Sequence, residues 1–295
     1  MPYIEMTPQR RLMLLAVGAM LGAVPLFLVA SLFRGELLSS IQNAGGVYLV
    51  TSLRVNVLVT FSLVLFTLPY AFVDYLNRSF TRSVESVLPE LFKGLAEAVR
   101  SGLTLPEALS SVAETLGGEV GKMLRQVVLL TEMGVTFQEA IARAFSRYRL
   151  PSLDRLGSIL LTAYESGGKV IDALETSAQI FGAIRSYEEE RATTINPHVL
   201  TIYAATILYV ILSLTILYVF VMPLSRLQGI PGALGKINPG VYAAVMYYSG
   251  VMIAFFGGLI AGKMRHGKAS AGLIHADIQV AIVAFSFLLA EKAMA

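Results

Sequence analysis

Residues 184–222 read IRSYEEERATTINPHVLTIYAATILYVILSLTILYVFVM, and along this stretch the composition changes from charged to apolar. Its second part, residues 199–222, contains no Asp, Glu, Lys or Arg. About 20 apolar residues suffice for a helix to cross the hydrocarbon core of a membrane. We therefore predict one continuous helix that begins outside the membrane at Ile184 and continues into a membrane span.

The rest of the chain likewise consists of charged segments and apolar segments. Charged residues make up only 15% of the 295 residues, and the mean hydropathy is +0.67. Residues 74–196 nevertheless hold 13 of the 23 Lys and Arg and 16 of the 20 Asp and Glu. Further apolar runs lie at 12–33, 55–73, 241–262 and 273–290. We predict an all-α membrane protein with about five transmembrane helices and a helical insert between the second and third.

This reading divides the chain into three parts: 1–73 with the first two spans, 74–198 with the insert, and 199–295 with the last three spans. The first apolar run is longer than the roughly 7–15 residues of a signal-peptide core, so we expect a retained helix rather than a cleaved signal. The densest basic run, Lys263 to Lys268, lies between the last two spans. Because short cytoplasmic loops carry an excess of Lys and Arg, alternation places the insert in the cytoplasm and the chain in the cell membrane.

The insert reads as helices throughout. Leu88, Leu91, Phe92, Leu95 and Val99 form one apolar stripe with helical spacing. Breaks in the pattern fall at glycines and at one proline, namely Gly102, Gly117-Gly118, Gly134, Pro151 and Gly167-Gly168. We predict a bundle of six helices arranged as three hairpins.

The glycine breaks belong to a repeat. Gly102-Leu-Thr-Leu-Pro-Glu107 matches Gly134-Val-Thr-Phe-Gln-Glu139 position by position. A fainter third copy comprises Gly167, Gly168 and Asp172. In each copy glycine can end one helix, and Thr followed three residues later by Glu can cap the next. A tetratricopeptide-like solenoid has a similar period, but its aromatic signature is missing, so we interpret the repeat as structural.

The insert resembles the type II secretion F-domain family, which comprises membrane platform proteins of type II secretion, type IV pili and archaella. The matching motifs are Leu-Pro-Glu-Leu at 88–91, Ser-Gly-Leu-Thr-Leu at 101–105, Glu-Met-Gly at 132–134 and Glu-Ser-Gly-Gly at 165–168. Residues 262–275, which include Gly262-Lys-Met-Arg-His-Gly267, look like the end of archaeal members. Many members carry two F domains, whereas this chain has one.

The resemblance implies a platform that couples a hexameric secretion ATPase in the cytoplasm to pilin-like subunits in the bilayer. With one F domain, the chain would pair with itself or with a sister subunit. It also implies partner-binding charges beside the membrane, although each could equally be a solvated surface. These residues are Arg185, Glu188, Glu189, Glu190, Arg191, Lys263, Arg265 and Lys268.

Residues for chemistry are few. The chain has no Cys and three His, and we find no metal motif, no cofactor motif and no phosphate-binding loop. We therefore expect neither an enzyme nor a nucleic-acid-binding protein. His275 and Asp277 begin the last span, where interface anchoring is favoured over a proton or substrate path.

Two other functions stay open from the residues alone. A small-molecule transporter would use His275, Asp277 and the tyrosines of the third span to line a path. A membrane-tethered signalling or scaffold protein would use the insert by itself.

Overall fold

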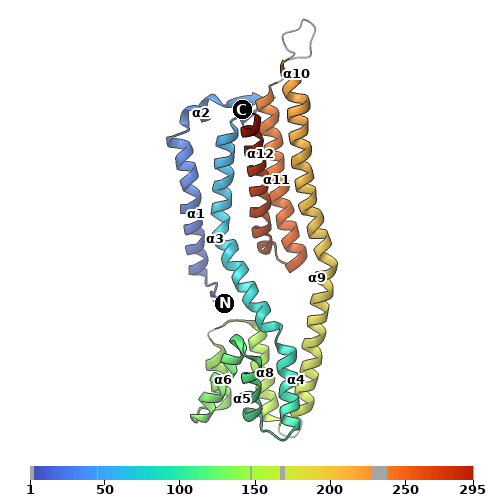
Figure 1. Ribbon diagram of the computed structural model, residues 1–295. Coiled ribbons are helices and arrows are strands. Elements are labelled where there is room, and N and C mark those ends of the chain that lie inside the picture. The colour runs from blue at the N-terminus through green and yellow to red at the C-terminus, as the bar shows by residue number, and fades with distance from the viewer. Residues whose placement is uncertain (1–2, 45, 147, 167–169, 227–237, 295) are drawn as a thin grey trace. The chain divides into compact units, whose positions relative to one another are not determined.

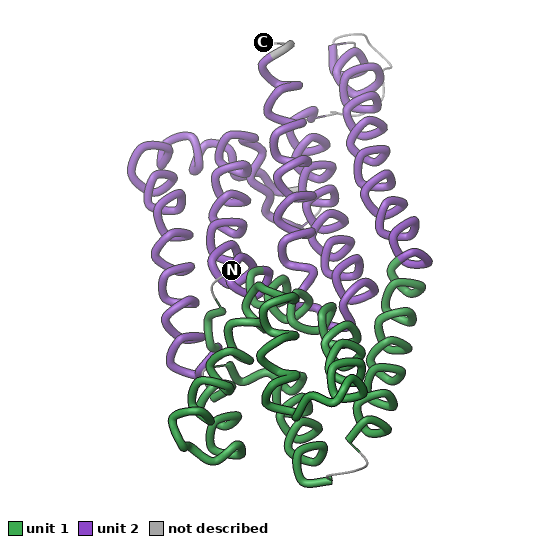
Figure 2. The backbone as a smooth tube through the Cα atoms, turned by 60° about the horizontal axis from the view of Figure 1, so that its bottom comes forward, with its two compact units in different colours: residues 1–5, 76–192 green, residues 6–75, 193–295 purple. Residues whose placement is uncertain are grey.

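The computed structural model describes residues 3–44, 46–146, 148–166, 170–226 and 238–294 (Figure 1). The chain divides into two compact units, which Figure 2 colours separately. Unit 1 comprises Met1–Glu5 and Leu76–Ala192, and unit 2 comprises Met6–Tyr75 and Thr193–Ala295. The insert and the membrane spans are thus separate packing units, although the first residues of the chain belong with the insert.

All regular secondary structure in the described part of unit 1 is helical. It contains the end of α3, five shorter helices and the start of α9. The bounds are α3 Leu53–Glu85, α4 Leu88–Arg100, α5 Leu105–Leu116, α6 Gly118–Glu132, α7 Phe137–Phe145, α8 Pro151–Glu165 and α9 Val170–Thr215. Each of α4 to α7 contacts the helix that follows it. The grouping of the insert into three hairpins stays a prediction. The structure also separates α3 from α4, at a break that is not among the predicted ones.

The break between α3 and α4 was not expected from the sequence. It falls at Ser86 and Val87, just before Pro89 in the first turn of α4. Proline has no N–H and is tolerated at the start of a helix, so Pro89 favours a new helix over a continuation of α3. The apolar stripe of α4 then turns inward: Leu88, Leu91, Phe92 and Leu95 are all completely buried in the core of unit 1.

The repeated turns share one geometry. Gly102 and Gly134 have φ of +98° and +88°, which favours glycine because it lacks a Cβ. Leu103 N donates to Ala98 O at 3.2 Å, and Val135 N donates to Leu130 O at 3.0 Å, the pattern of a Schellman turn. The two copies therefore end their helices in the same way.

Unit 2 contains the apolar helical segments that are candidates for membrane spans. Its remaining elements are α1 Pro8–Ser31, α2 Arg34–Ser39, β1 Ile41–Ala44, β2 Val47–Val50, a π-helical turn Ile216–Val221, α10 Met222–Arg226, α11 Pro239–His266, a 3₁₀ turn Ala269–Gly272 and α12 Leu273–Met294. Among the described residues, five helices are long and apolar enough to cross a membrane, which confirms the five predicted spans by length and composition. Large apolar side chains such as Met20, Phe27 and Leu208 face outward, as lipid-facing residues would.

Two features of unit 2 were not predicted. The strands β1 and β2 form an antiparallel hairpin in which Ile41 pairs with Val50. The π-helical turn follows α9 directly, and such turns are rare outside functional or strained sites.

Small residues allow the membrane helices to pack closely. A Cβ built on Gly18 would lie 2.3 Å from Phe66 O, and one on Gly258 would lie 2.2 Å from the Ala276 backbone. The Gly18-x-x-x-Gly22 and Gly258-x-x-x-Gly262 pairs therefore allow the backbones of neighbouring helices to approach closely.

Candidate functional site

Helices α3 and α9 belong to both units. Residues 53–75 of α3 lie in unit 2 and its last turns lie in unit 1, whereas α9 leaves unit 1 after Ala192. Both helices continue without interruption, although α9 contains Pro197. At 1.5 Å per residue, the 46 residues of α9 span about 69 Å. Two helices, α3 and α9, therefore contribute residues to both units.

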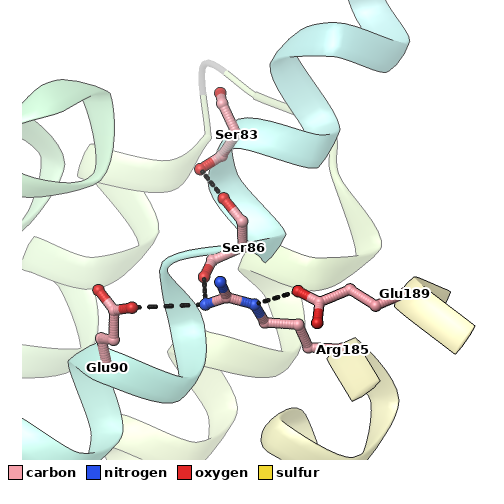
Figure 3. Close-up of polar contacts among 5 residues, drawn as sticks. All are labelled: Ser83, Ser86, Glu90, Arg185 and Glu189. Carbon is pink, nitrogen blue, oxygen red and sulfur yellow. Dashed lines mark hydrogen bonds and ion pairs between the residues drawn. The ribbon is translucent and has the colours of Figure 1, made fainter. Parts of the chain in front are cut away.

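Within unit 1, Arg185 of α9 ties that helix to the break between α3 and α4 (Figure 3). Its Nη1 donates to the backbone carbonyl of Ser86 at 3.1 Å and lies 3.4 Å from Glu90 Oε1. Its Nε donates to Glu189 Oε1 at 2.9 Å. The planar guanidinium presents its N–H donors in fixed directions and so holds several acceptors in one geometry, whereas the three donors of an ammonium group rotate.

The electrostatics of this cluster favour the charged form of the arginine. The hydrogen bond and the charge of Glu189 raise the pKa of Arg185, and the bond to Glu90 adds to the effect. All three side chains are partly exposed to solvent, so the cluster orients the helices more than it stabilises the fold.

Within unit 2, α12 is hydrogen-bonded to both shared helices. Thr67 of α3 donates to Asp277 Oδ1 at 2.6 Å, and Thr206 of α9 donates to Gln279 Oε1 at 2.7 Å. Asp277 is 8% exposed and Gln279 is completely buried. Polar bonds between membrane helices fix which faces meet, since an unpaired group has no water to turn to.

A further bond joins the same two helices. The hydroxyl of Tyr203 in α9 lies 2.8 Å from Nδ1 of His275 in α12, and the rings meet edge to face. His275 and Gln279 are one helical turn apart and both contact α9, whereas Asp277 contacts α3. We call Thr67–Asp277, Thr206–Gln279 and Tyr203–His275 the membrane polar contacts.

The charged residues that were predicted as partner sites fall in both units. Glu188, Glu190 and Arg191 are exposed on α9 in unit 1, where Arg185 and Glu189 bond each other as described. Lys263 and Arg265 lie in the last turn of α11 in unit 2, and Lys268 precedes the 3₁₀ turn. The structure thus brings together Arg185 and Glu189, and it gives Arg185 an internal role that the sequence did not indicate.

The repeat residues lie at helix starts and ends. Thr104 and Glu107 form a capping box, in which Thr104 N donates to Glu107 Oε2 at 2.8 Å. Thr136 caps α7 through Glu139 N, whereas the Glu139 carboxylate accepts from Arg143 at 2.6 Å. The third copy is described only in part: Asp172 lies in the first turn of α9, and Gly167 and Gly168 lie outside the described residues.

Sequence reasoning missed several residues of these contacts. Thr67, Thr206 and Gln279 are polar residues within apolar runs, which was the available signal. Ser86 carried no signal, because it acts through its backbone carbonyl. Among the described residues, no group of three His, Cys, Asp or Glu is placed to hold a metal ion.

Residues 91–223 match the family described as "Type II secretion system (T2SS), protein F". The match runs from α4 to α10 and so includes both the insert part and the membrane part of α9. No curated protein and no solved structure matches the chain. Residues 91–223 therefore carry a protein F domain, and the described residues of the chain include five helices that are long and apolar enough to cross a membrane.

Proposed function

We propose that this chain is the membrane platform of a type IV pilus-like, archaellum-like or type II secretion machine. A hexameric secretion ATPase would act on unit 1 in the cytoplasm, and pilin-like subunits would be added at the membrane unit. The observation that carries the proposal is α9, one continuous helix within the matched family segment that runs from the insert into an apolar span.

The mechanism follows from the shared helices. A displacement of the insert would be transmitted by α3 and α9, and Arg185 of α9 bonds the backbone directly after the end of α3. In the membrane unit, α12 contacts both helices through the membrane polar contacts. The three helices therefore respond together, and pilin subunits would meet a bundle whose arrangement depends on the insert.

We propose two separate charged contacts for the ATPase, one in each unit. In unit 1, Glu188 and Glu190 are exposed on α9; in unit 2, Lys263 and Lys268 are exposed at and after the end of α11. Charges at the rim of an interface steer and orient a partner more than they add affinity. Reversing Glu188 and Glu190, or Lys263 and Lys268, should weaken co-purification of the ATPase and reduce filaments while the protein still folds. A wild-type filament yield from either charge-reversed variant would exclude the contact that this variant reverses.

The central test interrupts α9 between the units. Replacing Ala192 and Thr193 by Gly-Gly lowers helix propensity by about 1 kcal/mol or more at the point where the helix leaves the insert. We expect filament assembly or secretion to be lost while the ATPase still binds. The matched control places Gly-Gly at Arg125 and Gln126, two exposed residues of α6 within unit 1.

The control should lose a similar amount of helix propensity and keep its activity. The proposal fails if the interrupted α9 supports normal filaments. It also fails if the purified chain alone moves a small solute across liposomes. Subunit counting in the purified complex would further test whether the single F domain pairs with a second copy or with a sister subunit.

A further inference from the structure

The first described residues of the chain pack on the insert. Tyr3, Ile4 and Glu5 belong to unit 1, although the chain continues from them directly into α1 of unit 2. Only Met6 and Thr7 separate Glu5 from Pro8, the first residue of α1. The three residue steps from Glu5 to Pro8 span at most about 11 Å, so the contacts of Glu5 are close along the chain to the start of a candidate membrane helix.

Tilted aromatic contacts hold the first of these residues. The Tyr3 ring lies 5.4 Å from the ring of Phe80 and 5.9 Å from that of Tyr148. Phe80 and Tyr148 stack on each other at 5.2 Å, and Phe80 is only 1% exposed. Burial raises the pKa of the Tyr3 hydroxyl, with a smaller contribution from the charge of Glu5 that Arg149 opposes. Tyr3 thus extends the apolar core of unit 1.

The next two residues are held by polar contacts. Ile4 N donates to Asn77 Oδ1 at 2.9 Å, and Asn77 Nδ2 donates to Ile4 O at 2.8 Å. One side-chain amide therefore satisfies both backbone groups of Ile4. Glu5 Oε1 lies 3.0 Å from Arg149 Nε, and this ion pair joins Glu5 to the segment between α7 and α8.

We propose that Tyr3–Glu5 is a strap that binds the insert and ties the start of α1 to it. The binding surface is formed by Asn77 and Phe80 at the end of α3 and by Tyr148 and Arg149 between α7 and α8. The insert then has three connections to the membrane unit, namely α3, α9 and the strap. The docking of the strap is independent of the platform function, whereas its effect on filament assembly rests on that function.

The strap also bears on topology. The spans α1 and α3 both lie between the strap and the insert, and two crossings return the chain to the same side of a membrane. The contact of Tyr3–Glu5 with the insert therefore agrees with an N-terminus on the insert side.

Because the chain has no cysteine, a single engineered thiol can report on the strap. Ile4→Cys is the reporter, since the described contacts of Ile4 are made by its backbone. In native membranes we expect slow labelling of this thiol by a maleimide. Asn77→Ala removes both hydrogen bonds and should speed the labelling about tenfold. Arg82→Ala, an exposed change on the same helix, is the matched control and should leave the rate unchanged.

A charge exchange guards against simple misfolding. Glu5→Arg should speed the labelling, and Glu5→Arg combined with Arg149→Glu should restore the slow rate. The strap is excluded if Ile4→Cys reacts as fast as a thiol at Met133, which is 80% exposed, and Asn77→Ala changes nothing. If the strap is released and filaments still form normally, its mechanical role is wrong while its docking stands. If the chain is no platform at all, the labelling results still hold.

Discussion

Replacing Thr206 by Val should destabilise the membrane unit more than replacing its partner Gln279 by Leu. Thr206 Oγ1 lies 2.7 Å from Gln279 Oε1, and it also lies 3.2 Å from the backbone carbonyl of Ile202. Without Gln279, the threonine hydroxyl keeps an acceptor within its own helix. Without Thr206, the amide oxygen of a completely buried glutamine loses its donor.

The expected magnitudes follow from this asymmetry. Leaving a buried polar group unpaired costs about 1–3 kcal/mol, whereas removing both partners is nearly neutral. Interhelical bonds in membranes fall at the lower end, with a mean of roughly 0.6 and a maximum of about 1.7 kcal/mol. We therefore expect Thr206→Val to lower the free energy of unfolding by about 1–1.5 kcal/mol. Gln279→Leu should stay within about 0.5 kcal/mol of the wild type, and the double variant should match Gln279→Leu.

The assay is reversible unfolding of the purified protein in mixed micelles, with all four proteins compared in one double-mutant cycle. Filament assembly by the same variants would show whether the contact also matters for coupling. The reasoning is refuted if Gln279→Leu is the more damaging single change. It is also refuted if the effects of the two changes simply add, because then the side chains do not act as a pair.

Three further predictions concern other parts of the chain. Gly258→Val should prevent stable packing of α12, because its Cβ would lie 2.2 Å from the backbone of that helix. Gly182→Ala, where the new Cβ meets no other atom, should raise the free energy of unfolding by about 1 kcal/mol. Thermal unfolding of both variants and the wild type checks these two effects. The hydrogen bond from the backbone N–H of Thr104 lowers the pKa of Glu107 below its ordinary value of 4.5. The capping box therefore stabilises the fold fully above pH 4.5, and this stabilisation is lost as the pH falls through the lowered pKa of Glu107 in the folded protein. Glu107→Ala should therefore reduce the unfolding temperature at pH 7 and have little effect in strong acid. Arg185→Lys keeps the charge but not the fork, so we expect several-fold fewer filaments at an almost unchanged unfolding temperature, and equal filament yields would exclude a coupling role.

Much of the architecture could be predicted because it depends on local composition. Apolar runs of the required length mark the five spans whatever their neighbours are, and all five are helices in the structure. The turns at Gly102 and Gly134 are also local, since a glycine with positive φ and the threonine that follows it lie within a few residues. The helix through Ala192 was predictable because charged and apolar parts share one helical pattern.

The contacts that define the candidate site could not be predicted in this way. Thr67 and Asp277 are 210 residues apart, and no spacing rule links them. Arg185 looked like part of a solvated or partner-binding surface, whereas two of its three described partners, Ser86 and Glu90, lie at the α3–α4 break and in the first turn of α4. That break itself depends on Pro89 beginning a helix, which the apolar pattern alone did not show.

The amino-acid sequence by itself determined whether each segment is charged or apolar, and this composition decides whether the segment enters a membrane or packs in water. It also determined the local ends of the helices and the protein F resemblance at the insert. The tertiary structure decided which distant side chains meet: α12 with both shared helices, Arg185 with the α3–α4 break, and Tyr3–Glu5 with the insert. The physical reason is range, since burial preference and helix capping act over a few residues, whereas a hydrogen bond joins whichever groups the packed helices bring within about 3 Å.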